Sequence, residues 1–144
     1  VTAIVASITL RVAALGALVS SGPKAAFIGA VSAHAIARSA AVSTMLVATP
    51  ATGDGLGADY VTRLRRGASV IGIAMAVLVS AALGGWWVAV TLGVAAPCTF
   101  AVARWSKHKI GGFSGDVLGA IEQVVEIGVL IALSIVAGHH HTWW

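Results

Sequence analysis

Charged residues are scarce in this sequence. Asp, Glu, Lys and Arg make up only 10% of its 144 residues, whereas 58% are hydrophobic and the mean hydropathy is +0.96. A soluble domain carries about 25% charged residues. A chain this poor in charge cannot cover its own surface in water, so we expect it to lie in a lipid bilayer.

Cysteine is also nearly absent, and the single Cys98 excludes an intrachain disulfide. The apolar run around Cys98 favours a buried, inert thiol over a nucleophile. The net charge of +4 comes from 9 Lys and Arg against 5 Asp and Glu. Because the basic residues cluster at the ends of apolar runs and form no continuous basic face, we expect no nucleic-acid binding.

Long apolar runs are abundant. Each is near the ~20 residues that cross a bilayer, and none alternates as a β-barrel strand would. Backbone groups in lipid must pair within their own segment, so helices are the default. The sequence therefore predicts an all-α fold, a polytopic membrane helix bundle that forms one transmembrane domain over residues 1–144. The five predicted spans are about Val1–Ser20, Ala25–Ala48, Ala68–Leu83, Trp86–Ala103 and Val117–Ala137, with a tight turn at Gly84-Gly85.

Basic residues lie mainly in two segments between these spans. Residues 50–67 contain three arginines, and residues 104–116 contain Arg104, Lys107 and Lys109. Five spans place both segments on one side of the membrane, and the positive-inside rule makes that side cytoplasmic. We therefore predict two cytoplasmic basic loops and an external C-terminus.

A glycine-rich segment before the last span is the most informative motif. Its three glycines permit positive φ and close backbone approach, and a lysine precedes them. Ser114 or Asp116 then stands at a helix N-terminus, whose free N–H groups favour an anion. These residues would cradle a phosphate or pyrophosphate, and Asp116 could hold Mg²⁺ against it; the simpler alternative is a glycine turn with an Asp cap. The predicted cradle consists of Lys109, Gly111, Gly112, Ser114, Gly115 and Asp116.

Ionisable side chains also occur inside the predicted spans. Glu122 and Glu126 share one face of the last span, and His34 and Arg38 share one face of the second. Such groups are costly in lipid and usually face protein, water or a partner. We expect Arg38 and Glu126 to point into the bundle, where Arg38 neutralises Glu126 or reaches an anionic substrate. Glu126 could also bind substrate or handle protons, His34 is more often a core histidine than a ligand, and Arg11 pairs or snorkels.

The run Gly111–Ala120, followed by Glu122, Gln123 and Glu126, resembles the C-terminal signature of the cobalamin synthase family. Members of this family are also called adenosylcobinamide-GDP ribazoletransferases. The family pattern is a Gly-Gly, a hydroxyl residue and Gly-Asp-x-Leu-Gly-Ala, with a Glu about ten residues beyond the Asp. In this signature, Asp116 matches the aspartate of the pattern.

Two further positions extend the resemblance over essentially the whole chain. Arg38 and the run Gly55-Leu56-Gly57 resemble family positions and occur in family order. This sequence departs from the family at Ala51-Thr52-Gly53, where the family often has an arginine. The family's Asp-rich motif lies upstream of this chain, which begins at Val1 inside an apolar run. We therefore expect the chain to be the C-terminal part of a longer domain.

The resemblance implies a membrane transferase of cobalamin (vitamin B12) biosynthesis in the bacterial plasma (inner) membrane. The full-length enzyme would join adenosylcobinamide-GDP to α-ribazole or its 5′-phosphate and release GMP, with Mg²⁺ held mainly by upstream carboxylates. Asp116 would be a catalytic residue and a metal ligand. The residues that would bind substrate are Arg38, Lys109, Gly111, Gly112, Ser114, Gly115 and Glu126.

Two other expectations accompany this hypothesis. A homo-oligomer is one, and the chain without its upstream part is expected to be inactive. The residues alone are also compatible with a transporter or channel fragment, because such proteins carry intramembrane charges. A CDP-alcohol-type phosphotransferase is the remaining alternative.

Overall fold

The computed structural model describes residues 2–51 and 56–139 of the chain. In this part, an isolated bridge between Pro50 and Phe113 is the only β-structure, and the regular elements are all helices. This confirms the predicted all-α fold. The helices are α1 (Thr2–Ser20), α2 (Pro23–Val47), α3 (Leu56–Arg63), α4 (Arg66–Gly84), α5 (Trp87–Ile110) and α6 (Gly115–His139).

Five of these helices, all except α3, are long and apolar enough to cross a membrane, which confirms the predicted number of spans. The chain is thus a multi-pass membrane protein. The helices α5 and α6 extend several residues beyond the predicted spans. Helix α3 lies within residues 50–67, which we predicted to be a basic loop. Its Asp59 in the first turn and Arg63 in the last turn complement the helix dipole, which favours a short helix here.

Glycines shape the turns between the spans. Gly22 has φ 127° and precedes Pro23, which starts α2 in the position where proline costs no hydrogen bond. Gly85 has φ 58°, and its N–H donates to the carbonyl of Ala81 at 2.8 Å. The predicted tight turn at Gly84-Gly85 is therefore confirmed.

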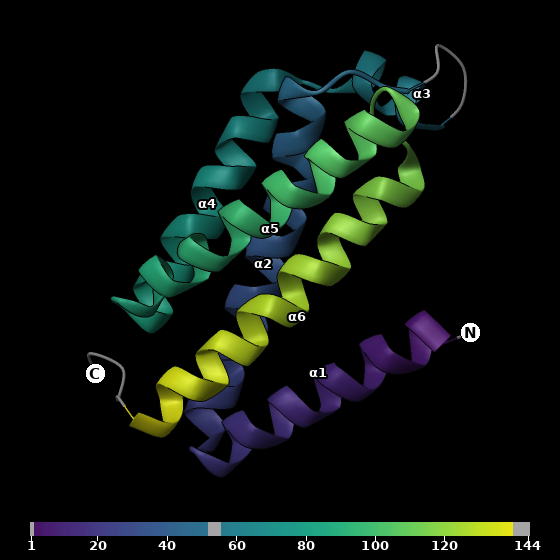
Figure 1. Cartoon of the computed structure of the whole chain (residues 1–144). Helices are drawn as coiled ribbons and strands as arrows, with labels where there is room; N and C mark the ends of the chain where they lie inside the picture. The colour runs from purple at the N-terminus through teal and green to yellow at the C-terminus, as the bar shows by residue number, and fades with distance from the viewer. Residues whose placement is uncertain (1, 52–55, 140–144) are drawn as a thin grey trace.

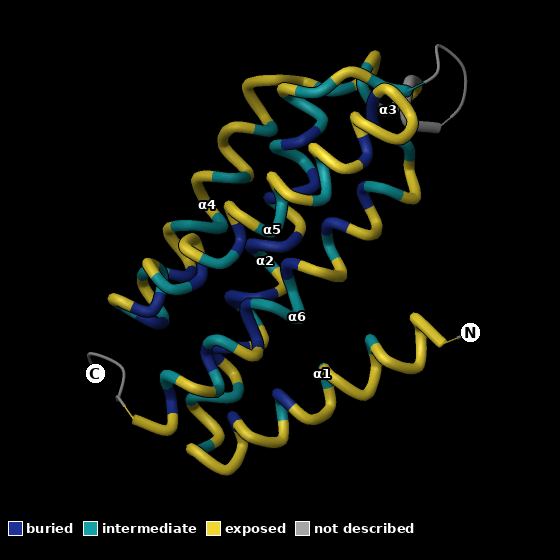
Figure 2. The backbone as a smooth tube through the Cα atoms, in the orientation of Figure 1, coloured by how far each residue is buried: buried dark blue, intermediate teal, exposed yellow. Residues whose placement is uncertain are grey.

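Helix α2 lies in the middle of the bundle and contacts α1, α4, α5 and α6, while α5 and α6 also pack directly against each other (Figure 1). Its buried Ala33 and Ala37 pack in one core with Ile121 and Val125 of α6. Small residues let helices approach closely in lipid. Buried positions accordingly concentrate along α2 and α6, while much of α1 and α4 is exposed (Figure 2).

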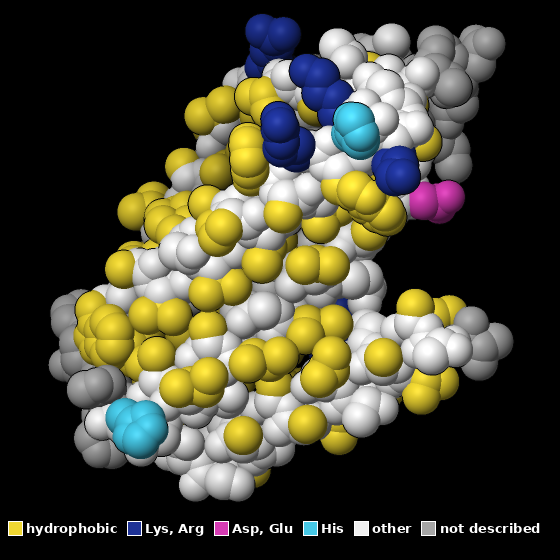
Figure 3. All heavy atoms as spheres, in the orientation of Figure 1, with side chains coloured by type: hydrophobic (Ala, Val, Ile, Leu, Met, Phe, Trp, Pro, Cys, Tyr) yellow, Lys and Arg dark blue, Asp and Glu magenta, His cyan; other side chains and the backbone are white. Residues whose placement is uncertain are grey.

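The exposed surface is largely apolar. Ile4, Ile71 and Phe100 each keep more than half of their surface accessible. Exposed apolar areas of this kind mark a membrane contact surface. Lysine and arginine side chains gather instead at one end of the molecule (Figure 3). We call it the basic end; its basic residues are Arg63, Arg65, Arg66, Arg104, Lys107 and Lys109.

Candidate functional site

The glycine-rich segment forms a sharp turn between α5 and α6. Gly111 adopts the left-handed conformation with φ 79°, and its N–H donates to the carbonyl of Lys107 at 3.0 Å, which ends α5. Gly112 lies directly against the backbone of residues 49–51. A Cβ at this position would come within 2.7 Å of the Ala51 nitrogen, so only glycine fits here.

Backbone hydrogen bonds join this turn to the chain segment that follows α2. The Phe113 N–H donates to the Thr49 carbonyl at 3.1 Å, and the Ala51 N–H donates to the Phe113 carbonyl at 2.9 Å. The buried Ser106 hydroxyl donates to the carbonyl of Gly112 from the last part of α5. Phe113 is itself buried, against Ala41 of α2. The turn is therefore held by two neighbouring elements.

Ser114 caps the start of α6. Its hydroxyl accepts a hydrogen bond from the Val117 N–H at 3.4 Å, and its carbonyl accepts from the Leu118 N–H at 3.1 Å. Of the two residues predicted to stand at the N-terminus of this helix, Ser114 is therefore the cap, because Asp116 lies inside the first turn and is exposed. The N–H groups of Gly115 and Asp116 begin the helix and have no acceptor within it. The helix end thus presents free donors beside one carboxylate.

Helix α6 continues from this turn with a polar face. Its exposed Asp116, Gly119 and Gln123 follow one another at three- and four-residue intervals, and the partly buried Glu122 and Glu126 lie beside them. We call these five residues the polar face of α6. The C-terminal end of α1 lies close to α6, and its N-terminal end lies farther away (Figure 1). Figure 3 shows a hollow between the N-terminal part of α1 and the rest of the molecule.

Two contacts connect α1 to the polar face. Nη2 of Arg11 lies 2.7 Å from Oε2 of Glu126, and the Ser7 hydroxyl donates to Oε1 of Gln123 at 2.7 Å. Of the two alternatives for Arg38, the one in which it neutralises Glu126 is therefore wrong. Helix α1 covers this part of α6 and brings Arg11 to the carboxylate, while Arg38 lies nearer Glu122, at 4.0 Å.

Arg38 also differs from its predicted orientation. Its side chain is 65% exposed, whereas that of Glu126 is only 21% exposed. The prediction that both point into the bundle therefore holds for Glu126 and fails for Arg38. His34, one turn away on the same face of α2, is exposed as well and is no core histidine. Arg38 is left with a guanidinium group that a ligand can reach.

The structure thus separates the predicted site residues into two neighbouring groups. Gly111, Gly112, Ser114, Gly115 and Asp116 form one turn, with the exposed Lys109 in the last turn of α5. The second group consists of Arg38 on α2 and Glu126 on α6, and it lies farther along α6 from the turn. The family position at Gly55 lies outside the described residues.

Sequence reasoning missed the residues that hold these groups in place. Ser106, which anchors Gly112, and Ser7, which contacts Gln123, carried no signal, because serine is common in membrane helices. Arg11, the partner of Glu126, did carry a signal in the sequence. Arg11 interrupts an apolar run, and an ionised group at that depth needs a counter-charge.

Comparison with known proteins gives a consistent assignment. Residues 1–134 match the family model described as cobalamin-5-phosphate synthase. An adenosylcobinamide-GDP ribazoletransferase of Azorhizobium caulinodans is 34% identical over 148 residues, covering 96% of this chain and 54% of that protein. A protein of the same name from Halorubrum lacusprofundi is 35% identical over 115 residues, covering 77% of this chain and 44% of the relative.

The chain spans about half the length of the curated relatives it matches. No solved structure matches it. The match to the family model nevertheless includes the glycine turn, the polar face of α6 and both groups of candidate residues. The chain therefore belongs to the cobalamin-5-phosphate synthase family.

Proposed function

We propose that this chain is the C-terminal, membrane-embedded part of an adenosylcobinamide-GDP ribazoletransferase of cobalamin biosynthesis. The observation that carries the proposal is the family match over residues 1–134. The named relatives support it, since they share the ribazoletransferase name. The substrates would be adenosylcobinamide-GDP and α-ribazole or its 5′-phosphate. Family membership favours this activity over a transporter or a CDP-alcohol phosphotransferase.

The reaction would be a phosphoryl transfer. A hydroxyl oxygen of the ribazole attacks the phosphorus that bears the cobinamide, the bond from that phosphorus to the bridging oxygen breaks, and GMP leaves with that oxygen. The hydroxyl proton is released to a base or to water. Phosphoryl transfer depends mainly on positioning and on neutralising phosphate charge. The protein must therefore offer cations and N–H donors to the pyrophosphate.

The glycine turn is suited to this task. The free N–H groups of Gly115 and Asp116 would donate to phosphate oxygens at the positive end of α6. Lys109 would add charge, Gly111 would allow the backbone to come close to the phosphate, Gly112 would hold the turn against residues 49–51, and the Ser114 cap would set the direction of the helix end. These roles are supported by the backbone contacts of Gly112 and by the exposure of Lys109 and Asp116. Asp116 would then stand beside the reacting phosphates.

Arg38 would bind a second part of the substrate. Its neighbour Glu122 lies six residues after Asp116, about 9 Å along the helix axis. An anionic substrate extending from the turn toward α2 would therefore meet the exposed guanidinium. Glu126 would act as a brace, because it holds Arg11 and with it α1.

Mg²⁺ requires several oxygen ligands. Among the residues that the structure describes, no three His, Cys, Asp or Glu side chains gather as a metal site would need. The described residues therefore do not form a Mg²⁺ site by themselves. Asp116 would contribute at most one ligand to an ion held mainly by the rest of the longer protein, and the roles given above do not depend on it.

The location of the protein belongs to the same proposal. We propose a bacterial plasma membrane with the basic loops 50–67 and 104–116 in the cytoplasm. Six basic residues at the basic end, against Lys24 in the first turn of α2, support this orientation. A homo-oligomer stays a prediction.

A chimera would test the activity. The chain would replace the corresponding C-terminal half of the Azorhizobium relative, and GMP release from adenosylcobinamide-GDP would be followed in liposomes with and without α-ribazole. We expect ribazole-dependent GMP release from the chimera and none from the chain alone. A chimera that is monodisperse and helical but releases no GMP would contradict the proposal, as would activity that needs no ribazole.

A further inference from the structure

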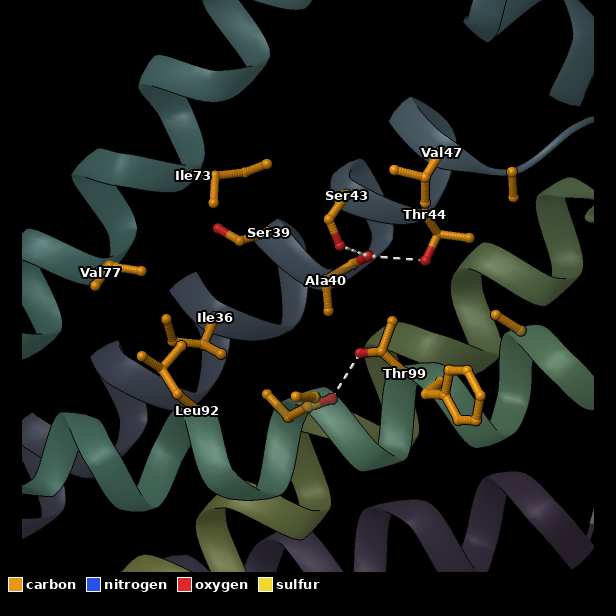
Figure 4. Close-up of a pocket in the computed structure, with 15 residues that line it drawn as sticks. Ile36, Ser39, Ala40, Ser43, Thr44, Val47, Ile73, Val77, Leu92 and Thr99 are labelled. Carbon is orange, nitrogen blue, oxygen red and sulfur yellow. Dashed lines mark hydrogen bonds between the residues drawn. The ribbon is translucent and has the colours of Figure 1, made fainter.

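A groove lies on the side of α2 away from α1 and α6. Helices α4 and α5 meet at the turn of Gly85 and diverge toward the basic end, with α2 behind them (Figure 1). Between the three helices is a cavity of about 450 Å³. Its walls include Ile36 of α2, Ile73 and Val77 of α4 and Leu92 of α5 (Figure 4). The groove therefore lies between three helices and has apolar walls.

A second cavity of about 360 Å³ continues the groove to the basic end. The two cavities share Thr44, Val47 and Phe100 among their lining residues, and the second adds Arg104 and Lys107. Both basic side chains are exposed. The groove thus has an apolar interior and a positively charged mouth.

Hydroxyl groups in the interior do not make it polar. Ser43 and Thr44 donate to the carbonyl of Ala40 at 2.8 and 3.0 Å, and Thr99 donates to the carbonyl of Ala95 at 2.7 Å (Figure 4). Ser39 bonds in the same way within α2. Each of these hydroxyls already donates its hydrogen to a backbone carbonyl of its own helix. An occupant of this part of the groove needs no polar groups.

The length of the groove corresponds to one membrane leaflet. Leu92 and Ala103 line its two ends on α5, and eleven residues of helix measure about 16 Å. The hydrocarbon core of a bilayer is about 30 Å thick, so one leaflet takes up about half of it. A helix 10–12 Å wide would occupy roughly 1,300–1,800 Å³ over this length, more than the cavity holds. The groove therefore suits a slender occupant.

The mouth suits a phosphate group. Arg104 and Lys107 also line a neighbouring surface cavity together with His108 and the exposed Trp105. Tryptophan is typical of the membrane interface. Basic pockets between membrane helices bind anionic lipid head groups, and each basic residue near such a surface contributes about 1 kcal/mol. The positively charged mouth suits the head group of an anionic lipid, and the apolar walls at leaflet depth suit its acyl chain.

We propose that this groove binds an anionic phospholipid, with its phosphate between Arg104 and Lys107 and one acyl chain between α4 and α5. The site goes beyond the proposed transferase activity and does not depend on it. The lipid would fill the space where α4 and α5 diverge and would fasten the two helices to α2. The occupant is a lipid of the surrounding bilayer and is not a substrate of the transferase.

Native mass spectrometry of the purified chain would test the site. The protein in detergent would be offered phosphatidylglycerol and phosphatidylcholine with identical acyl chains, in equal amounts. We expect one tightly retained lipid, with phosphatidylglycerol preferred at least about fivefold, the factor that one basic residue provides. The double variant Arg104→Gln/Lys107→Gln should bind both lipids equally. Equal binding by the unaltered protein would overturn the proposal.

The acyl chain and the head group need separate controls. Ala96→Trp fills the groove and should lower the retention of both lipids at least about fivefold, whereas Ala82→Trp, on an exposed part of α4 outside the groove, should leave it unchanged. If Ala96→Trp does not fold, Ser39→Leu on the α2 wall serves instead. Arg65→Gln/Arg66→Gln removes the same charge from the basic end without touching the groove. If this control lowers the preference as much as Arg104→Gln/Lys107→Gln does, general surface charge explains the binding and the site does not exist.

A photo-cross-linker identifies the occupant in the membrane. Phe100 would be replaced by benzoylphenylalanine and the protein irradiated in its native membrane. We expect adducts with phospholipid. Adducts with a protein segment would show that a helix of the longer protein covers the groove, and would overturn the lipid assignment.

Discussion

Gly112 lies so close to Thr49 that a Cβ on the glycine would meet the threonine carbonyl oxygen. The Pro50 carbonyl carbon and the Ala51 nitrogen lie beside that oxygen. The two residues come from different turns of the basic end. Because the neighbouring Phe113 exchanges two hydrogen bonds with residues 49 and 51, the contact joins the end of α2 to the start of α6. The position of the phosphate-binding turn proposed above is thereby set by α2.

Gly112→Ala tests this contact. The added Cβ would lie 2.7 Å from the Ala51 nitrogen and 2.8 Å from the Pro50 carbon, and rigid backbone cannot easily yield. We expect the free energy of unfolding to fall by about 1–3 kcal/mol, measured by titration with denaturing detergent. The amides of Ala51 and Phe113 should also exchange faster with deuterium. Gly115→Ala is the matched control, since a Cβ there meets nothing within 4 Å; equal effects of the two variants would show the contact to be loose.

Ser114 and Asp116 should separate a structural role from a chemical one. Ser114→Ala removes the cap of α6 and should lower the free energy of unfolding by about 1 kcal/mol. Asp116→Asn removes no cap, so its effect on stability should stay below about 1 kcal/mol. In the active chimera, however, Asp116→Asn should reduce turnover at least about tenfold, or roughly 1.4 kcal/mol of barrier. Near-normal ribazole transfer by this variant would remove Asp116 from the proposed chemistry.

The pairing of Arg11 with Glu126 can be measured by a double-mutant cycle. Arg11→Gln, Glu126→Gln and the double variant should give a coupling energy of about 1–2 kcal/mol for the free energy of unfolding in micelles. The same cycle for Arg38 and Glu122, which are 4.0 Å apart and more exposed, should give less than about 0.5 kcal/mol. Equal coupling energies for the two pairs would mean that Arg38 is as firmly held as Arg11, and less available to a ligand than proposed.

The orientation of the spans can be tested by cysteine labelling. In a Cys98→Ala background, Asp59→Cys and His108→Cys should react with a membrane-impermeant reagent from the same side, which we predict to be the cytoplasm. Ser21→Cys, in the turn between α1 and α2, should react only from the other side. Labelling of positions 59 and 108 from opposite sides would contradict the arrangement of five spans.

The number and positions of the spans could be predicted from the sequence because lipid imposes a simple rule. A long apolar segment with few charges has to form a helix, since its backbone has no water to bond. The helix ends were less predictable. Helix α5 continues through Lys107 and Lys109 to Ile110, because basic residues suit the negative end of a helix even where hydropathy has already fallen.

The partners of the charged residues could not be predicted in the same way. Spacing along one helix shows that Glu122 and Glu126 share a face, but it does not show which helix covers that face. The answer depends on α1, which brings Arg11 to Glu126 and leaves Arg38 exposed beside Glu122. Likewise, the sequence indicated that the glycines permit close backbone approach, but it did not show what approaches Gly112. The structure shows that it is a chain segment some sixty residues earlier.

The pair formed by Arg11 and Glu126 has a consequence for how the chain is made. The two residues are separated by 115 positions, and they lie in the first and the last span described. At a synthesis rate of about 5–20 residues per second, the arginine is made about 6–23 s before its carboxylate. An arginine at the centre of a lone membrane helix costs about 2.5–3.5 kcal/mol on insertion scales. We therefore expect α1 to stay beside the insertion machinery, or shallow in the membrane, until α6 emerges.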